Sequence, residues 1–68
     1  MTLIVDYGTY TVKLPFKVPL DGSYTEWYAR EKWCEQHFKK ETYRYYTHEN
    51  AWYFKHERDA TFFSMRWL

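Results

Sequence analysis

Apolar and other side chains alternate without a break over residues 10–19, and this pattern restricts the start of the chain to extended structure. One side of the pattern carries Tyr10, Val12, Leu14, Phe16 and Val18. A period of two is typical of a strand with one buried face. Gly8 lies in a turn-forming stretch just before it, so residues 2–6 and 9–15 are predicted to form a β-hairpin. Because Pro15 has no N–H to donate, the strand ends or becomes an edge there, and the chain stays extended to Leu20.

A capping box predicts where the first helix begins. Ser23 can accept from the backbone of Glu26 while the Glu26 side chain reaches back, so a main helix is expected over about residues 23–40. Helical spacing places an apolar stripe on one side, with Glu31 inside the stripe. The members of this stripe are Tyr24, Trp27, Cys34 and Phe38. Trp33 falls on the opposite, polar side.

The remaining residues repeat the same sequence of elements. Residues 42–47 and 51–55 alternate like strands, and residues 48–50 between them are predicted to form a turn. Residues of about 58–67 have helical spacing, with Ala60, Phe63 and Trp67 on one stripe. We therefore expect a single α+β domain over residues 1–68. Its order is ββαββα, with one antiparallel sheet covered by two helices.

Large rings dominate the composition. Trp, Tyr and Phe make up 25% of the 68 residues. A chain of this length buries only about 60% of its unfolded surface. Aromatic rings help to build a core from few residues. The rings that this small core cannot bury are expected to contact another molecule. The formal net charge of +1 gives no strong field that would attract nucleic acid or a membrane.

The only cysteine excludes a disulfide within the chain, and it favours a reducing compartment. No apolar run approaches the roughly 20 residues of a membrane span. The first residues lack the features of a signal peptide. A cytoplasmic protein that does not associate with membranes is the expectation.

Metal binding and catalysis are not expected. Cys34 and His37 have C-x-x-H spacing, with His48 and His56 downstream, but no second close pair completes a zinc site. Glu31 and Glu35 have the spacing of ordinary solvated or lysine-paired helix charges. No glycine-rich phosphate loop is present. We predict no enzyme activity, no cofactor and no metal.

One binding hypothesis concerns the sheet face that points away from the helices. Two flat rings and several cations would share that face, which could stack bases and pair phosphates of single-stranded RNA or DNA. The residues are Lys13, Arg44, Tyr46, Tyr53 and Lys55, with Thr11 beside them. An ordinary solvated sheet face has a similar composition, and the net charge weakens the nucleic-acid alternative.

The preferred hypothesis is a non-enzymatic module that binds a protein. Trp33 is either an exposed anchor or is covered by the C-terminal helix. The second alternative is open because Phe62 and Met65 lie away from the main apolar stripe of that helix and would need another apolar surface to pack against. Trp and Tyr are over-represented at interface hot spots. The expected anchors are Trp33, Tyr46 and Tyr53, with Arg44 and Lys55 giving orientation. The rings that the core cannot bury could also form the interface of a homodimer.

The end of the chain resembles small proteins of T4-like tailed phages, including those that infect cyanobacteria. In those proteins an aromatic strand leads into a D-A-x-x-F-x-x-[RK]-W helix. The matching residues here are Trp52, Tyr53, Phe54, Asp59, Ala60, Phe63, Arg66 and Trp67. The resemblance implies a protein that acts inside the infected host cell. It would bind a host or phage protein and change, typically inhibit, its activity. No site residue follows from it.

Overall fold

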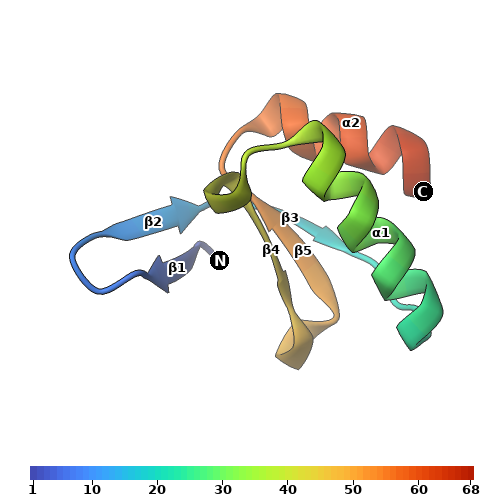
Figure 1. Ribbon diagram of the computed structural model, residues 1–68, viewed down its shortest axis with the longest axis horizontal. Coiled ribbons are helices and arrows are strands. Elements are labelled where there is room, and N and C mark those ends of the chain that lie inside the picture. Colours follow the sequence, from blue (N-terminus) through green and yellow to red (C-terminus); the bar gives the residue numbers. More distant parts are fainter.

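A computed structural model describes residues 1–68 and shows a small α+β fold (Figure 1). The strands are β1 (Leu3–Asp6), β2 (Thr11–Leu14), β3 (Phe16–Pro19), β4 (Tyr43–Tyr46) and β5 (Ala51–Phe54). The helices are α1 (Tyr24–His37) and α2 (Glu57–Trp67), and two short 3-10 turns are η1 (Lys40–Thr42) and η2 (Thr47–Glu49). The predicted α+β class and ββαββα order are confirmed, with β2 and β3 forming the long extended segment.

The strands form two antiparallel sheets, whereas the sequence predicted one. β1 pairs only with β2, and the second sheet has the order β3-β5-β4. The first ladder ends where Leu3 faces Leu14, and after Pro15 the next residue, Phe16, faces Phe54 of β5. Pro15 has no N–H for a ladder, and β1 has no further strand residue to pair with. The chain therefore changes sheets at this proline.

The two sheets and the helices enclose two separate apolar clusters. Both helices cover one face of the three-stranded sheet (Figure 1). The larger cluster lies beneath them and consists of Val18, Cys34, Tyr43, Trp52, Phe54, Ala60 and Phe63. The smaller cluster joins the β1–β2 hairpin to the sheet and consists of Val5, Leu14, Ala51 and Tyr53. Every residue of β5 is buried, because this central strand has a cluster on each face.

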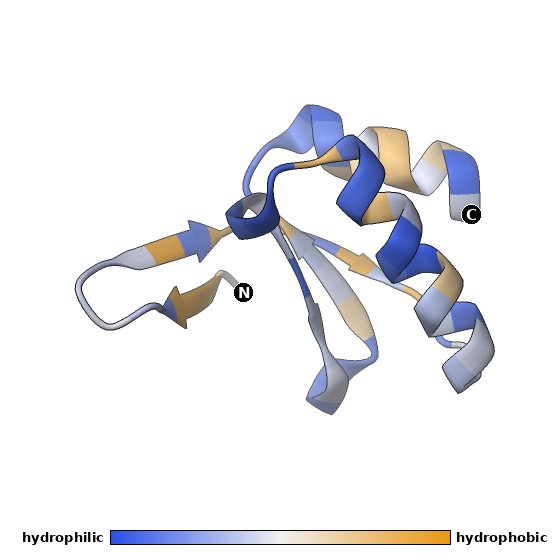
Figure 2. Ribbon diagram, viewed as in Figure 1, coloured by the Kyte–Doolittle hydropathy of each residue, from blue (hydrophilic) through white to orange (hydrophobic).

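The change of sheet also changes which residues face the helices. Leu14 and Phe16 share a side in the sequence pattern, yet Leu14 belongs to the hairpin cluster and Phe16 packs against the helix cluster. Figure 2 shows apolar residues in both strands of the hairpin, although the helices lie elsewhere. The hairpin therefore packs against the sheet surface that the sequence pattern left open to solvent.

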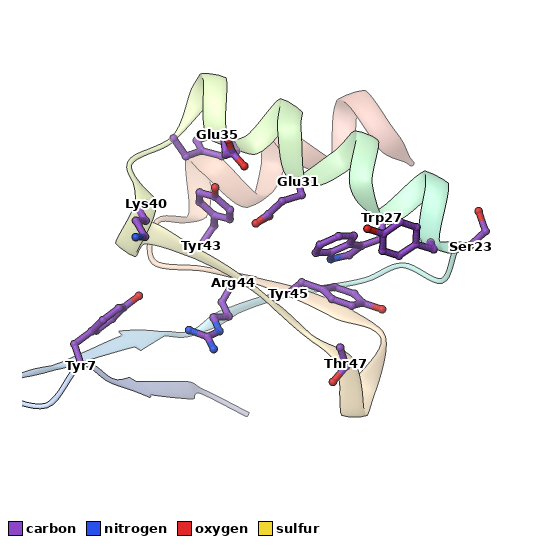
Figure 3. Close-up of a pocket in the computed structure, with 13 residues that line it drawn as sticks. Tyr7, Ser23, Trp27, Glu31, Glu35, Lys40, Tyr43, Arg44, Tyr45 and Thr47 are labelled. Carbon is purple, nitrogen blue, oxygen red and sulfur yellow. The ribbon is translucent and has the colours of Figure 1, made fainter.

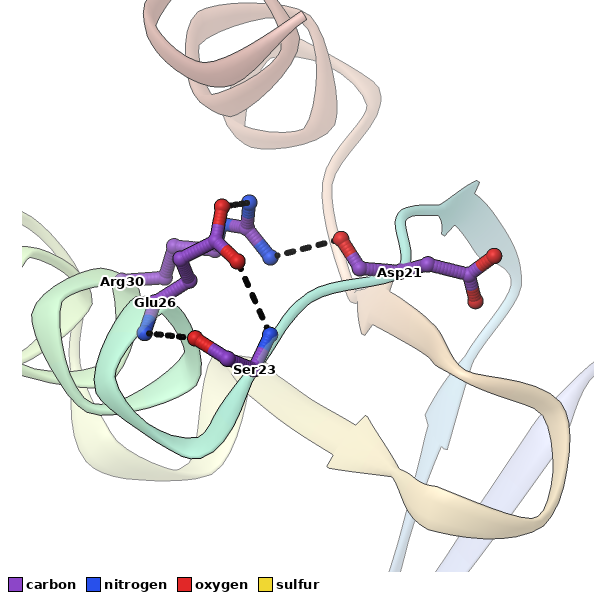
Figure 4. A network of polar contacts seen from close by, with 4 residues as sticks. All are labelled: Asp21, Ser23, Glu26 and Arg30. Atoms are coloured by element: carbon purple, nitrogen blue, oxygen red, sulfur yellow. Dashed lines mark hydrogen bonds and ion pairs between the residues drawn. The ribbon is translucent and has the colours of Figure 1, made fainter.

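A polar network fixes the start of α1 (Figure 4). The predicted capping box is present, since the Ser23 side chain accepts from the Glu26 backbone and Glu26 accepts from the Ser23 N–H at 2.9 Å. Arg30, which is buried, donates to the Asp21 carbonyl at 3.1 Å and lies 3.7 Å from Glu26. Gly22 leaves room for that guanidinium, because a Cβ there would lie 2.5 Å from its Nη1.

The ends of the helices differ slightly from the prediction. α1 was expected to continue to about residue 40, but it ends at His37 because Phe38 has extended backbone angles. Phe38 then directs its ring into the larger cluster, and η1 leads the chain into β4. Neither helix has the length and the apolar character that crossing a bilayer would require.

Candidate functional site

Trp33, the main predicted anchor, lies between the two helices. Its ring centroid is 5.1 Å from that of Phe62 and 6.3 Å from that of Trp67, both on α2. Its ring also stacks on His37 at 4.2 Å. Trp33 is half-buried, so of the two alternatives the structure favours coverage by the C-terminal helix. Met65, by contrast, remains 79% exposed.

Tyr53 is not an exposed ring, and its interpretation as a binding anchor is wrong. Its side chain is fully buried under the hairpin, where Val5 and Leu14 cover it. The Tyr53 hydroxyl donates to Glu49, whose carboxylate also contacts Lys17 at 3.1 Å. The hydrogen bond to Glu49 raises the pKa of Tyr53 to about 12. This tyrosine therefore has a structural role.

The other predicted site residues are spread over the surface. Tyr46 packs edge-on against Tyr53 at 6.2 Å and is half-buried. Arg44 faces Tyr53 in the ladder and is exposed, as is Lys55 directly after β5. Lys13 lies on the hairpin, opposite Ile4. The continuous face of rings and cations that was expected for nucleic acid is therefore interrupted by the hairpin.

The cysteine and the histidines do not converge. Cys34 is fully buried, and burial raises the pKa of its thiol. His37 contacts the Trp33 carbonyl, His48 packs on Tyr46, and His56 precedes α2. No three His, Cys, Asp or Glu side chains are grouped so that they could hold a metal ion.

A cleft of about 1000 Å³ lies between α1 and β4. α1 lines it with the side that carries the apolar stripe, and β4 contributes Tyr43 and Tyr45 from the side that faces the helix (Figure 3). Arg44 lines the cleft from the other side of β4. The start of the helix and the neighbouring turns close its ends. The lining residues include Tyr24, Trp27, Glu31, Glu35, Phe38, Lys40, Tyr43, Arg44 and Tyr45.

Six of the 13 residues that line the cleft carry aromatic rings. The rings of Trp27 and Tyr45 lie 6.3 Å apart across the cleft, and Tyr24 packs on Trp27 at 5.6 Å. Tyr24 stands at the rim and is 76% exposed. The Trp27 indole N–H is buried and has no hydrogen-bond partner in the protein. Rings with polar tips of this kind are typical of binding surfaces.

Glu31 brings a negative charge into this apolar wall. Its side chain points from α1 toward β4 (Figure 3), and one carboxylate oxygen is buried without a hydrogen-bond partner. Burial, with a smaller contribution from the neighbouring Glu35, raises the pKa of this carboxyl above its ordinary value. The cations Lys32 and Arg44 oppose this shift only in part. A carboxylate with a perturbed pKa in a cleft marks a candidate functional site.

The cleft also borders a free edge of the sheet. β4 pairs with β5 on one side and with no strand on the other. The Lys55 N–H donates to the Thr42 carbonyl at 2.9 Å, and hydrogen-bonded pairs alternate along an antiparallel ladder. With the observed register, the backbone N–H and C=O groups of Arg44 and Tyr46 point to β5. Those of Tyr43 and Tyr45 point to the outer edge of the sheet.

The spacing of Glu31 and Glu35 predicts ordinary solvated or lysine-paired helix charges, whereas the structure places Glu31 in the cleft. The signal was its place inside an apolar helical stripe, between Trp27 and Cys34. The rings of Tyr43 and Tyr45 could be assigned to one strand face, but nothing local showed that this face lies opposite Glu31. Arg44 is the only predicted site residue that lines the cleft.

Comparisons with protein-family models, with curated proteins and with solved structures found no match for this chain.

Proposed function

We propose that this protein is a non-enzymatic module that binds another protein through the cleft between α1 and β4. The observation that carries the proposal is the combination of an aromatic wall with a carboxylate that has no partner inside the protein. Apolar lining with a few polar groups is typical of sites that bury a ligand group. Four rings remain exposed, and Tyr24 stands directly at the rim of the cleft.

The resemblance of the C-terminal segment to small phage proteins supports a protein of an infected host as the partner. A module of this kind changes the activity of its target by occupying a surface that the target needs, so inhibition is the effect that we propose. The proposed location is the host cytoplasm, in line with a single cysteine that forms no disulfide.

Single-stranded nucleic acid is the less favoured ligand. One of the two rings on which bases were expected to stack, Tyr53, is fully buried, and the hairpin interrupts the face of cations that was expected to pair phosphates. Binding that falls steeply with added salt and that Lys55→Ala weakens would favour nucleic acid over a protein partner.

The test is affinity capture from host lysate with matched tyrosine variants. Tyr24 and Tyr28 are both exposed on α1 one turn apart, but only Tyr24 lines the cleft. Tyr24→Ala should reduce capture of the partner, whereas Tyr28→Ala should not. Both variants should keep the wild-type circular dichroism spectrum, because neither ring belongs to the apolar clusters.

The captured protein is then purified and its affinity is measured directly. Truncating a hot-spot ring costs more than about 1 kcal/mol, so Tyr24→Ala should weaken binding at least about fivefold. Nuclease treatment of the lysate should leave capture unchanged. Equal loss for both tyrosine variants, or capture that disappears with nuclease, would count against this proposal.

A further inference from the structure

We infer that the cleft receives an extended segment of the partner and that a lysine or arginine side chain of this segment inserts beside Glu31. The inference rests on the proposed function and names the chemistry that the partner must present. Its three supports are a carboxylate without a counter-ion, a wall of aromatic faces, and an unpaired strand edge along the same cleft.

The nearby cations Lys32 and Arg44 offset the burial of Glu31 only in part. Glu31 takes part in none of the ion pairs of the molecule, although its own helix contains the pairs Arg30–Glu26 and Lys32–Glu35. Arg44 lines the cleft, but its side chain points to the other side of β4, away from Glu31 (Figure 3). Burying a carboxylate without a partner is unfavourable, so a cation that enters the cleft gains an interaction that the protein does not supply.

The rings around Glu31 suit a cation with an apolar stem. Trp27 and Tyr45 lie on one side of Glu31 along the cleft, and Tyr43 lies on the other (Figure 3). The faces of such rings attract ammonium and guanidinium groups. Lysine and arginine place several methylene groups behind the charge, and these groups would pack on the same rings. A purely apolar side chain would leave the carboxylate unpaired, and an acidic side chain would be repelled by it.

The outer edge of β4 determines the shape of the partner segment. Tyr43 and Tyr45 direct their free backbone groups outward from the sheet, and the same two residues present their rings to the cleft. A peptide that adds to this edge as a strand would satisfy those backbone groups. Because side chains alternate along a strand, every second one would point toward α1 and Glu31.

The experiment selects peptides from a random heptapeptide library on immobilised wild-type protein and on Glu31→Gln. Glutamine keeps the size of the side chain and removes its charge. Glu57→Gln is the matched control, since Glu57 is exposed on α2 and does not line the cleft. Peptides selected on the wild type and on Glu57→Gln should carry lysine or arginine at one fixed position, and this preference should disappear on Glu31→Gln.

The best arginine peptide is then compared with the same peptide carrying citrulline, which has nearly the same shape and no charge. Wild-type protein should bind the arginine peptide about tenfold more tightly. Glu31→Gln should bind the two peptides equally. In NMR spectra the Trp27 indole N–H and the Tyr43 and Tyr45 amides should shift on binding, which locates the peptide at the cleft.

Three results of the peptide experiments would overturn the inference. They are selected peptides without a common cation, a cation preference that persists on Glu31→Gln, and failure of every peptide to bind at β4. An oligonucleotide that binds the cleft more tightly than the selected peptides would also overturn it. Capture of a host protein that depends on Tyr24 would still support the proposed function in each of these cases, so the two failures are distinguishable.

Discussion

Trp33 joins the two helices, so its removal should destabilise the domain without affecting the cleft. Truncating a buried tryptophan to alanine costs about 3–5 kcal/mol. Trp33 is only half-buried, which lowers the expected loss for Trp33→Ala to about 2–3 kcal/mol. Its ring contacts with Phe62 and Trp67 account for roughly 0.5–1.5 kcal/mol each. A domain of 68 residues has a total stability of roughly 3–10 kcal/mol, so the loss is a large share.

Thermal unfolding followed by circular dichroism measures this effect. In a domain of this size each 1 kcal/mol shifts Tm by about 4–8 °C, so Trp33→Ala should lower Tm by roughly 10–20 °C. Met65→Ala is the control, because Met65 is a large apolar residue of α2 that stays exposed. That substitution should change stability by less than about 0.5 kcal/mol. An unchanged Tm for Trp33→Ala would falsify the structural role and restore Trp33 as a candidate anchor.

Three further substitutions test local features. Ser23→Ala removes the cap of α1 and should cost about 1 kcal/mol in urea unfolding. Gly8→Ala should cost about 1 kcal/mol in the same assay, since φ at Gly8 is 97° and no atom crowds the position, which leaves backbone strain as the cause. Glu31→Gln should raise Tm at pH 7 and leave it unchanged at pH 4. The folded-state pKa of this carboxyl is raised, so wild-type stability is highest below the ordinary pKa of 4.5 and falls as pH rises above it.

Local signals in the sequence predicted most of the secondary structure. The capping box at Ser23 gave the start of α1, and the alternating residues gave the strands close to their observed bounds. The division into two sheets was not predictable from alternation, because alternation fixes the side of a strand and not the sheet to which the strand belongs. Pro15 was recognised as the end of a ladder, but the next partner, Phe54, lies almost forty residues away in the chain.

The candidate site was less predictable because it is made by contacts between distant segments. Helical spacing placed Glu31 among apolar residues. A single acidic residue in such a stripe can also extend beyond the element that packs on the helix, so that its carboxylate lies in water. The placement of β4 opposite α1 decides between these outcomes. Similarly, Tyr53 was expected to be exposed, because both predicted helices were placed on one face of the sheet and no element was predicted to cover the other face. The hairpin residues that cover it, Val5 and Leu14, lie far earlier in the chain.

Glu31 shows that a functional site can be recognised by a residue that lowers the stability of the fold. The helix could place an apolar residue at this position and extend the stripe from Trp27 to Cys34 without a break. Instead the chain holds a carboxylate against aromatic rings, where burial disfavours its charged form and where it forms no ion pair within the protein. In a domain with little stability to spare, this arrangement contributes nothing to packing. Local choices that oppose the fold are concentrated at functional sites, since the compensating interaction comes from the bound partner. The opposite effects expected for Glu31→Gln, a higher Tm and a weaker hold on cationic peptides, are therefore two consequences of one unpaired charge.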